Sequence, residues 1–278
     1  MDSRLTPARP DLAAAHLKGQ VEAARFVEGT LCSVARGRTS LKQAPLHDAP
    51  QTSELLYGES FTVYEERNGW AWGQSALDGY VGYVHAIALR KAIAPTHRVT
   101  ALMTPVFPAP DFKRPVIDML PMNARVAVQG CEKSYAAIAP NAYVWERALV
   151  PEGSKADDWV AVAERFEGTP YVWSGKTYAG LDCSGLIQTA LQAGGIAAPR
   201  DADMQEAALG TAVAFASDLS GLLRGDLVFW KGHMGVMLDA ARLLHANTFH
   251  MAVAIEPLAD AVTRITPIAG AITSVKRL

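Results

Sequence analysis

The chain has 278 residues, a length that predicts about two domains of ordinary size. Its 26 basic and 28 acidic residues give a formal net charge of −2, and no run of basic residues occurs, which argues against partners such as nucleic acid or an anionic membrane surface. Half of the residues are hydrophobic and 19% are charged, a composition that excludes a largely disordered chain.

The three cysteines are Cys32, Cys131 and Cys183, an odd number with wide spacing and no CxxC pair. This pattern predicts neither a disulfide framework nor a zinc ribbon. The histidines of the first half have no acidic or cysteine partner at ligand spacing, and no phosphate-binding glycine loop occurs. We therefore expect no metal site and no cofactor.

The first 25 residues carry seven charged side chains, and their longest apolar stretch is 12–15. A secretory signal needs about 7–15 consecutive apolar residues, and a membrane helix needs about 20, which no segment provides. These features predict a soluble, cytoplasmic protein without a membrane anchor. The sequence carries no signal for an oligomeric state.

The N-terminal half begins with an Ala-rich stretch at 11–26 that we interpret as one short helix with Asp11 as its cap, within a helical segment 1–27. From residue 28, short β-branched and aromatic runs alternate with turn residues, and strands are expected at 61–64, 69–72 and 79–84. The pattern P-x-x-x-A-P occurs at 45–50 and again 60 residues later at 105–110. This repeat predicts two small β-barrels in tandem, at 28–92 and 93–150.

The C-terminal part, 151–278, follows a linker-like stretch at 151–155. Trp159, Val162 and Phe166 have helical spacing, and this helix should end at Gly168. A second helix is expected at 182–193, followed by strands at 226–230, 233–238 and 243–246. Helices followed by an antiparallel sheet predict an α+β domain, with the helices packed on the sheet.

Cys183 lies in the first turn of the expected helix 182–193. Unpaired backbone N–H groups and the positive end of a helix favour a thiolate, and a thiolate is the nucleophile of covalent catalysis. The alternative is a small buried hydrophobic side chain, which is how Cys32 and Cys131 are interpreted.

His233 and His245 are the candidates for a base. If strands 233–238 and 243–246 form a hairpin that turns near Asp239, residues 233 and 245 face each other directly. One imidazole would then take the thiol proton while the other orients it. The alternative is that the two histidines are unrelated.

Five motifs occur along the second half in this order: PYVWSG at 170–175, LDCSGL at 181–186, PRD at 199–201 with Gln205, RGDLVF at 224–229 and GHMGV at 232–236. Together they resemble the NlpC/P60 family of papain-like cysteine peptidases, which cut bacterial cell-wall peptides. The motifs LLYGE at 55–59 and DGYVGY at 78–83 in the first half resemble the tandem bacterial SH3-like domains of the γ-D-glutamyl-L-diamino acid endopeptidase branch.

The resemblance implies a role for each matching residue. Cys183 would be the nucleophile, with its backbone N–H in the oxyanion hole. His233 would be the general base and acid, and His245 would orient it. The residues implied to contact the peptide in the catalytic domain are Tyr171, Asp182 and Ser184.

In this branch the first SH3-like domain reads the free amine of an N-terminal L-Ala with an acidic residue and a tyrosine. The matching positions are Glu59 and Tyr80, with Tyr83 as an alternative to Tyr80. A buried ammonium needs a carboxylate, so a site built around one rejects blocked peptides. The alternatives are a solvated turn residue for Glu59 and barrel core for the aromatic side chains.

The implied function is hydrolysis of the γ-D-glutamyl–diamino acid bond of murein peptides that begin with L-Ala, in the recycling of wall peptides. Two other functions stay open. One is an amidase or acyltransferase reaction on the same fold. The other is a non-catalytic protein that binds murein peptides.

Overall fold

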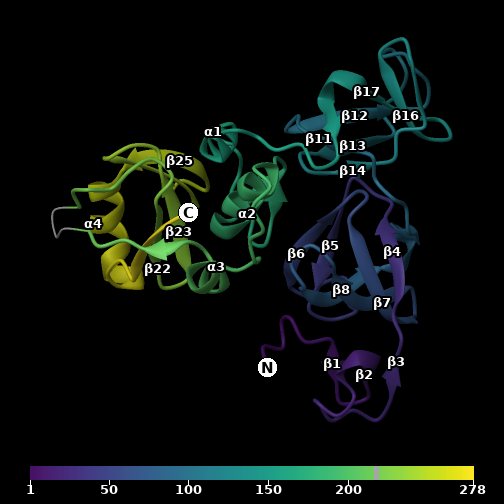
Figure 1. The fold of residues 1–278 in the computed structure, drawn as a ribbon, viewed down its shortest axis with the longest axis horizontal. Coiled ribbons are helices and arrows are strands. Elements are labelled where there is room, and N and C mark those ends of the chain that lie inside the picture. The colour runs from purple at the N-terminus through teal and green to yellow at the C-terminus, as the bar shows by residue number, and fades with distance from the viewer. Residues whose placement is uncertain (216–218) are drawn as a thin grey trace. The chain divides into compact units, whose positions relative to one another are not determined.

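The computed structural model describes residues 1–215 and 219–278; residues 216–218, inside the segment expected as the catalytic domain, lie outside the description. The chain divides into two compact units, Met1–Glu152 and Gly153–Leu278 (Figure 1). Within the described residues, no helix combines the length and the apolar character that crossing a bilayer would require.

The N-terminal segment is not the helix that the sequence predicted. It contains β1 (Ala8–Arg9), β2 (Leu12–Ala14), a 3-10 turn (Ala15–Leu17) and β3 (Phe26–Val27). Strand β2 is fully buried and pairs with β1 and β3, so tertiary packing overrides the helix propensity of its alanines. Gly19, with φ +83°, also interrupts the expected helix, and Asp11 pairs with Arg9 instead of capping it.

Residues 30–91 of the first unit form a seven-stranded sheet. Its core contains Val34, Leu41, Phe61 and Val84. Three of its strands, β7, β8 and β9, correspond to the three strands expected from the sequence. In sheet order the strands are β10 (Leu89–Lys91), β4 (Thr30–Val34), β7 (Ser60–Arg67), β8 (Trp70–Ser75), β9 (Val81–His85), β5 (Arg38–Lys42) and β6 (Gln51–Leu56).

Residues 97–151 form a second β structure with its own core around Val99, Leu120, Ile138 and Val144. The 60-residue spacing of the sequence repeat recurs here. The 3-10 turn Ala86–Ala88 precedes β10, and the turn Glu146–Ala148 precedes β18 sixty residues later. One sheet has five strands, in the order β13 (Asp118–Pro121), β12 (Met103–Phe107), β17 (Ala142–Trp145), β16 (Tyr135–Ala139) and β15 (Gly130–Glu132). The other has three strands, in the order β14 (Arg125–Val126), β11 (His97–Val99) and β18 (Leu149–Pro151).

The second unit contains the two expected helices, α1 (Trp159–Glu164) and α2 (Cys183–Ala193). The Asp158 side chain caps α1 by accepting from two backbone N–H groups. A short hairpin, β19 (Lys176–Thr177) and β20 (Gly180–Leu181), leads into α2. Two further helices, α3 (Ala202–Ala208) and α4 (Leu258–Ala269), were not expected from the sequence.

A six-stranded antiparallel sheet completes this unit, so the α+β prediction is confirmed. Helix α2 packs against β23 and β24, and α4 covers the sheet face that holds Val228, Met237 and Leu243. The strand order is β21 (Thr211–Ala212), β26 (Ser274–Arg277), β22 (Leu227–Trp230), β23 (His233–Met237), β24 (Arg242–Asn247) and β25 (Ala252–Pro257).

Candidate active site

Cys183 is the first residue of α2, as the sequence predicted, and its side chain is 7% exposed. The backbone N–H groups of the first turn of a helix have no carbonyl partner inside it. The backbone N–H groups of Met234 and Ser184 lower the pKa of the Cys183 thiol, which places both of them near its sulfur. Because Met234 directly follows His233, this proximity places the thiol beside the start of β23.

The protonation of Cys183 differs from the sequence-based expectation. Burial raises the pKa of the thiol to about 12, and the negative charge of Asp182 acts in the same direction. The two backbone N–H groups lower it by a smaller amount. In the protein without substrate the sulfur is therefore a thiol, and it would need a base to act as a nucleophile.

Asp182 is the N-cap of α2 and the centre of a buried polar cluster. Its carboxylate accepts from the Gly185 N–H at 2.6 Å and from the Ser174 N–H at 2.9 Å. Arg200, which is 1% exposed, donates to both carboxylate oxygens, at 3.0 Å and 2.8 Å. This two-pronged contact fixes the residue that precedes Cys183.

Ser184 is held by the same cluster. Its hydroxyl accepts from Arg200 at 3.0 Å, and its carbonyl accepts from the Gln205 amide at 3.0 Å. The sequence placed Arg200 and Gln205 in a motif but assigned them no certain contact. With these bonds made, the residues that flank Cys183 are positioned by buried side chains.

His233 and His245 lie close together, but in a different register from the predicted one. Strands β23 and β24 pair Met237 with Leu243, so the residue directly opposite His245 is Gly235. The prediction was wrong by two residues because the carboxylate of Asp239 accepts from the N–H groups of residues 241 and 242, which centres the turn one residue later. The two histidines are diagonal neighbours on one sheet face.

Gly235 makes this diagonal contact possible. A Cβ at this position would lie 2.9 Å from the Cβ of His245 and 3.0 Å from the carbonyl oxygen of Leu244. With hydrogen in its place, the His245 ring reaches His233, and His233 Nε2 lies 2.9 Å from His245 Nδ1.

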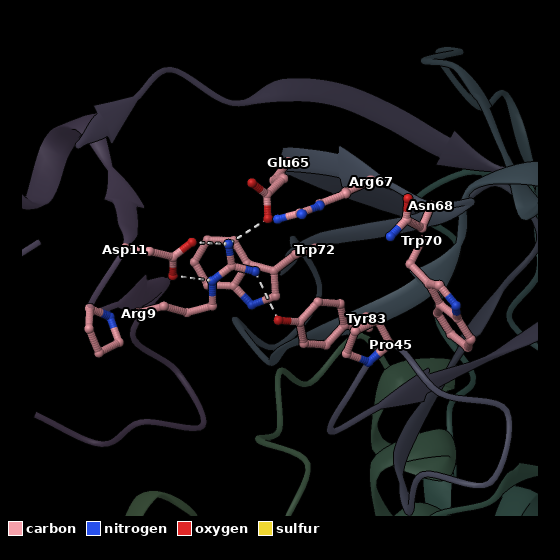
Figure 2. Close-up of a pocket in the computed structure, with 10 residues that line it drawn as sticks. Arg9, Asp11, Pro45, Glu65, Arg67, Asn68, Trp70, Trp72 and Tyr83 are labelled. Atoms are coloured by element: carbon pink, nitrogen blue, oxygen red, sulfur yellow. Dashed lines mark hydrogen bonds and ion pairs between the residues drawn. The ribbon is translucent and has the colours of Figure 1, made fainter. Parts of the chain in front are cut away.

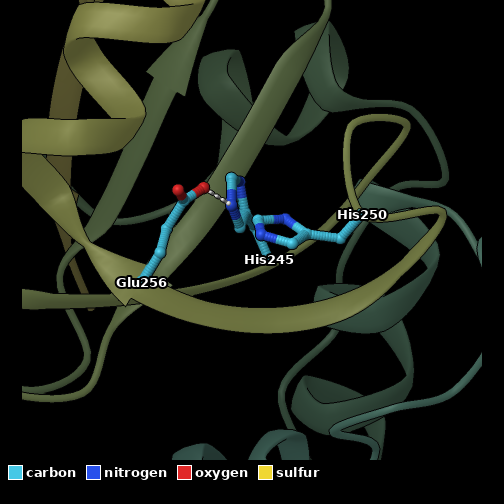
Figure 3. Close-up of side chains that lie close together, drawn as sticks. All are labelled: His245, His250 and Glu256. Atoms are coloured by element: carbon cyan, nitrogen blue, oxygen red, sulfur yellow. Dashed lines mark hydrogen bonds and ion pairs between the residues drawn. The ribbon is translucent and has the colours of Figure 1, made fainter.

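The contact chain continues to two residues that the sequence analysis missed. His245 Nε2 lies 2.6 Å from a carboxylate oxygen of Glu256 on β25, as Figure 3 shows. Arg264, on α4, donates to the same oxygen. Glu256 pairs with Leu243 across strands β24 and β25, and that register is the signal that places it beside His245.

This chain assigns a proton to each nitrogen. Burial raises the pKa of Glu256, but the hydrogen bond from His245 and the charge of Arg264 outweigh it, so that the pKa lies below its ordinary value. The carboxylate therefore accepts from His245 Nε2–H, which leaves His245 Nδ1 without a proton. His233 Nε2–H must donate to that nitrogen, and His233 Nδ1 then carries a free lone pair.

Both imidazoles are neutral in this arrangement. Burial lowers the pKa of His233 to about 3, and the positive charge of Arg264 acts in the same direction. Burial also lowers the pKa of His245, against the hydrogen bond with Glu256. A neutral His233 with a free Nδ1 is the form that can accept a thiol proton.

Tyr171 belongs to the same site. Burial raises the pKa of its hydroxyl, and the next largest causes are Cys183 and Asp182, which places the phenol near both groups. Its backbone N–H donates to Met251 at 2.9 Å. Its phenol therefore stays protonated at neutral pH and can donate a hydrogen bond.

The two residues expected to read the substrate amine lie in the first unit. Glu59 is 2% exposed, and its carboxylate accepts from the Leu56 N–H at 2.9 Å. The ring of Tyr80 is 6% exposed and packs in the core with Leu41 and Val84. Their role in substrate binding stays a prediction.

The alternative tyrosine, Tyr83, lines a cavity of about 520 Å³ in the same unit, drawn in Figure 2. Arg9 occupies one side of this cavity: its guanidinium stacks over Trp72 at 4.3 Å and donates to the Tyr83 hydroxyl at 2.8 Å. Glu65 accepts from Arg9 at 2.5 Å. The hydroxyl of Tyr83 is thus held by the N-terminal segment.

A third histidine, His250, lies beside His245 and Glu256 in Figure 3. Each of the three side chains offers a ligand atom, and these atoms lie within 4.8 Å of one another. Arg264 donates to the Glu256 oxygen that His245 also contacts, and its positive charge opposes a cation at that point. We therefore assign His245 and Glu256 to the hydrogen-bonded chain, while Nδ1 of His250 lies 3.0 Å from the side-chain oxygen of Asn247.

Comparison with known proteins identifies the second unit. The profile described as "NlpC/P60 family" matches residues 168–265, which include Cys183, His233 and His245. This chain contains an NlpC/P60 domain. The profile "Bacterial dipeptidyl-peptidase Sh3 domain" matches residues 41–89, so a bacterial SH3 domain lies in the first unit.

Relatives of the NlpC/P60 domain include two enzymes named gamma-D-glutamyl-L-lysine dipeptidyl-peptidase. The one from Bacillus cereus is 34% identical over 111 residues, which cover 37% of this chain and 32% of the relative. The one from Bacillus subtilis is 24% identical over 218 residues, 70% of this chain and 71% of the relative.

A solved NlpC/P60 family protein from Bacillus cereus has the same fold. It aligns with a TM-score of 0.73 and 20% identity, over 89% of this chain and 99% of that chain. An NlpC/P60 endopeptidase from Photobacterium damselae aligns with a TM-score of 0.60 over 89% of this chain.

Proposed function

We propose that this protein is a cysteine peptidase that hydrolyses the γ-D-glutamyl–diamino acid bond of murein peptides with a free N-terminal L-Ala. One observation carries the proposal: the hydrogen-bonded chain from Glu256 through His245 to His233, which leaves His233 Nδ1 as a base. The thiol of Cys183 lies beside the residue that follows this base.

In the first half-reaction, His233 Nδ1 takes the thiol proton as the Cys183 sulfur attacks the γ-carbonyl carbon of D-glutamate. The oxygen gains negative charge, which the backbone N–H of Cys183 at the N-terminus of α2 stabilises. His233 then gives its proton to the departing amine of the diamino acid. The carbon–nitrogen bond breaks, and the dipeptide remains on the sulfur as a thioester.

In the second half-reaction, water attacks the thioester and His233 accepts its proton. The carbon–sulfur bond breaks, the sulfur regains a proton, and L-Ala-γ-D-Glu leaves with a free carboxylate. His245 and Glu256 do not exchange protons with substrate in this scheme. They hold His233 in one tautomer and stabilise its positive charge when it is protonated.

The substrate part of the proposal rests on the family resemblance and on the names of the two Bacillus relatives. Glu59 would pair with the free ammonium of L-Ala, and Tyr80 or Tyr83 would contact the same end of the peptide. Asp182, Ser184 and Tyr171 would contact the peptide near the scissile bond. A cytoplasmic role in recycling wall peptides stays a prediction from the sequence.

The test is hydrolysis of L-Ala-γ-D-Glu-meso-diaminopimelate by the wild type and by Cys183→Ala, with the N-acetylated peptide measured in parallel. Cleavage of only the free-amine peptide, lost in the variant, is the expected result. Equal cleavage of both peptides would keep the nucleophile and remove Glu59 and Tyr80 from the proposal, and would favour an amidase-type reaction. No cleavage of either peptide would favour a protein that only binds murein peptides.

A further inference from the structure

A cavity of about 240 Å³ lies in the second unit and includes the catalytic base in its wall. It is smaller than the roughly 300–1,000 Å³ of pockets for drug-sized ligands, and a single amino-acid residue suits this size. Six of the residues that line it are Lys231, His233, Thr248, Arg264, Ile265 and Ile268.

The position of the cavity relative to the reacting atoms assigns it to one side of the scissile bond. His233 must lie beside the amine that leaves, because it donates a proton to that nitrogen. The acyl part, in contrast, is bonded to Cys183 at the start of α2. The cavity includes His233 and also Tyr171, which lies near Cys183, but none of Asp182, Cys183 and Ser184 is among its described lining residues. It therefore adjoins the leaving group.

The walls of the cavity combine positive charge with an apolar surface. Helix α4 supplies Ile265 and Ile268, against which methylene groups can pack. Among the described lining residues, the charged ones are Lys231 and Arg264, and no carboxylate joins them.

The two cations differ in what they already bind. The guanidinium of Arg264 is paired with Glu256 and stacks over the Phe249 ring at 4.4 Å. For Lys231, no ion pair occurs within residues 1–215 and 219–278. The charge of Arg264 is balanced, and that of Lys231 remains for a ligand.

We propose that this cavity is the subsite for the leaving diamino acid and that Lys231 pairs with the distal carboxylate of diaminopimelate. This inference rests on the proposed function and deepens it. Diaminopimelate carries two carboxylates, at the α position and at the distal end, whereas lysine carries an ammonium alone at its distal end. The cavity repels a bare distal ammonium and attracts the distal carboxylate, so the protein prefers diaminopimelate peptides to lysine peptides.

The experiment measures kcat/KM for four free-amine peptides. They are L-Ala-γ-D-Glu linked to L-lysine, to meso-diaminopimelate, and to meso-diaminopimelate with either the distal or the α carboxylate amidated. Each is tested with the wild type, Lys231→Met, Lys231→Arg and the control Lys276→Met, which removes a lysine of the same unit that does not line the cavity.

The wild type should prefer diaminopimelate to lysine, and Lys231→Met should reduce kcat/KM for diaminopimelate by about tenfold, the effect of one partly exposed charged hydrogen bond. Lys231→Arg and Lys276→Met should keep the preference. Amidation of the distal carboxylate should remove the advantage, whereas loss of the advantage only on amidation of the α carboxylate would contradict the proposal. Equal loss for all peptides in Lys231→Met, or the same loss in Lys276→Met, would overturn the inference while leaving the peptidase activity in place.

A binding measurement separates this inference from the reaction. Calorimetry with free meso-diaminopimelate and the Cys183→Ala protein tests the cavity without turnover. Binding that weakens in Cys183→Ala/Lys231→Met supports the subsite even if the wild type cleaves no peptide. Absence of binding at millimolar concentrations, together with equal kcat/KM for lysine and diaminopimelate peptides, would refute it.

Discussion

Replacing Gly235 by alanine tests whether the contact between His233 and His245 depends on the diagonal register. The new Cβ would lie 2.9 Å from the Cβ of His245 and 3.0 Å from the carbonyl oxygen of Leu244. Carbon atoms in good contact are about 3.5–4.0 Å apart, so β24 must move away by at least ~0.6 Å. Both close atoms belong to the backbone or are attached to it, so a change of rotamer cannot relieve the contact.

The same movement would carry His245 away from His233. The present distance of 2.9 Å between their nitrogens would reach the limit of a useful hydrogen bond. We expect kcat/KM to fall by about a hundredfold, the effect of a displacement near 1 Å in a catalytic group. The free energy of unfolding should fall by about 1–3 kcal/mol, as in other overpacked cores.

Peptide hydrolysis and urea unfolding of Gly235→Ala measure the two effects. Gly130→Ala is the control, because a Cβ at Gly130 meets no atom within 4 Å and its φ needs no glycine. Both proteins should fold, and only Gly235→Ala should lose activity. If Gly235→Ala keeps the activity and stability of the wild type, the register described for β23 and β24 does not control the alignment of the histidines.

Three further changes test other parts of the site. Arg200→Met leaves the buried carboxylate of Asp182 without its cation, so urea unfolding should show that the free energy of unfolding falls by about 3–5 kcal/mol. A fall below about 1 kcal/mol, the contribution of a surface ion pair, would contradict this. His245→Ala should lower kcat/KM by about a hundredfold or more. His245→Gln should retain more activity, because its side-chain carbonyl can accept from His233 Nε2–H. Equal rates for the two variants would exclude a role of His245 in fixing the tautomer of His233. The pKa of Cys183 is raised to about 12, so its thiolate fraction increases tenfold per pH unit below that value. Alkylation by iodoacetamide, measured by mass spectrometry, should therefore be slower at Cys183 than at the exposed Cys131 at pH 7. The alkylation rate of Cys183 should rise steadily from pH 7 to 9. Rapid alkylation of Cys183 at pH 6 would instead indicate a thiolate–imidazolium pair.

The sequence allows prediction of those residues whose position depends only on nearby residues in the chain. Cys183 at the start of α2 depends on an amphipathic stretch and a cap directly before it, and both are visible in the sequence. The histidine pair was found from the hairpin pattern, but its register was not, because the Asp239 side chain decides where the turn is centred.

Residues that act across the fold were harder to find. Glu256 and Arg264 come from β25 and α4, and only the strand pairing and the packing of α4 bring them to His245. The N-terminal stretch 11–26 was assigned to a helix because alanine favours one, and burial of β2 between two strands decided otherwise. In each case a long-range contact outweighed the local pattern.

The ion pairs of Arg9 have a consequence for any shortened form of the protein. Arg9 covers one face of the Trp72 indole and neutralises Glu65 together with Arg25. A chain that starts after residue 27 would expose that indole to solvent beside a carboxylate that has lost both cations. Such a protein would have an exposed aromatic surface, and we expect it to self-associate more than the full chain does.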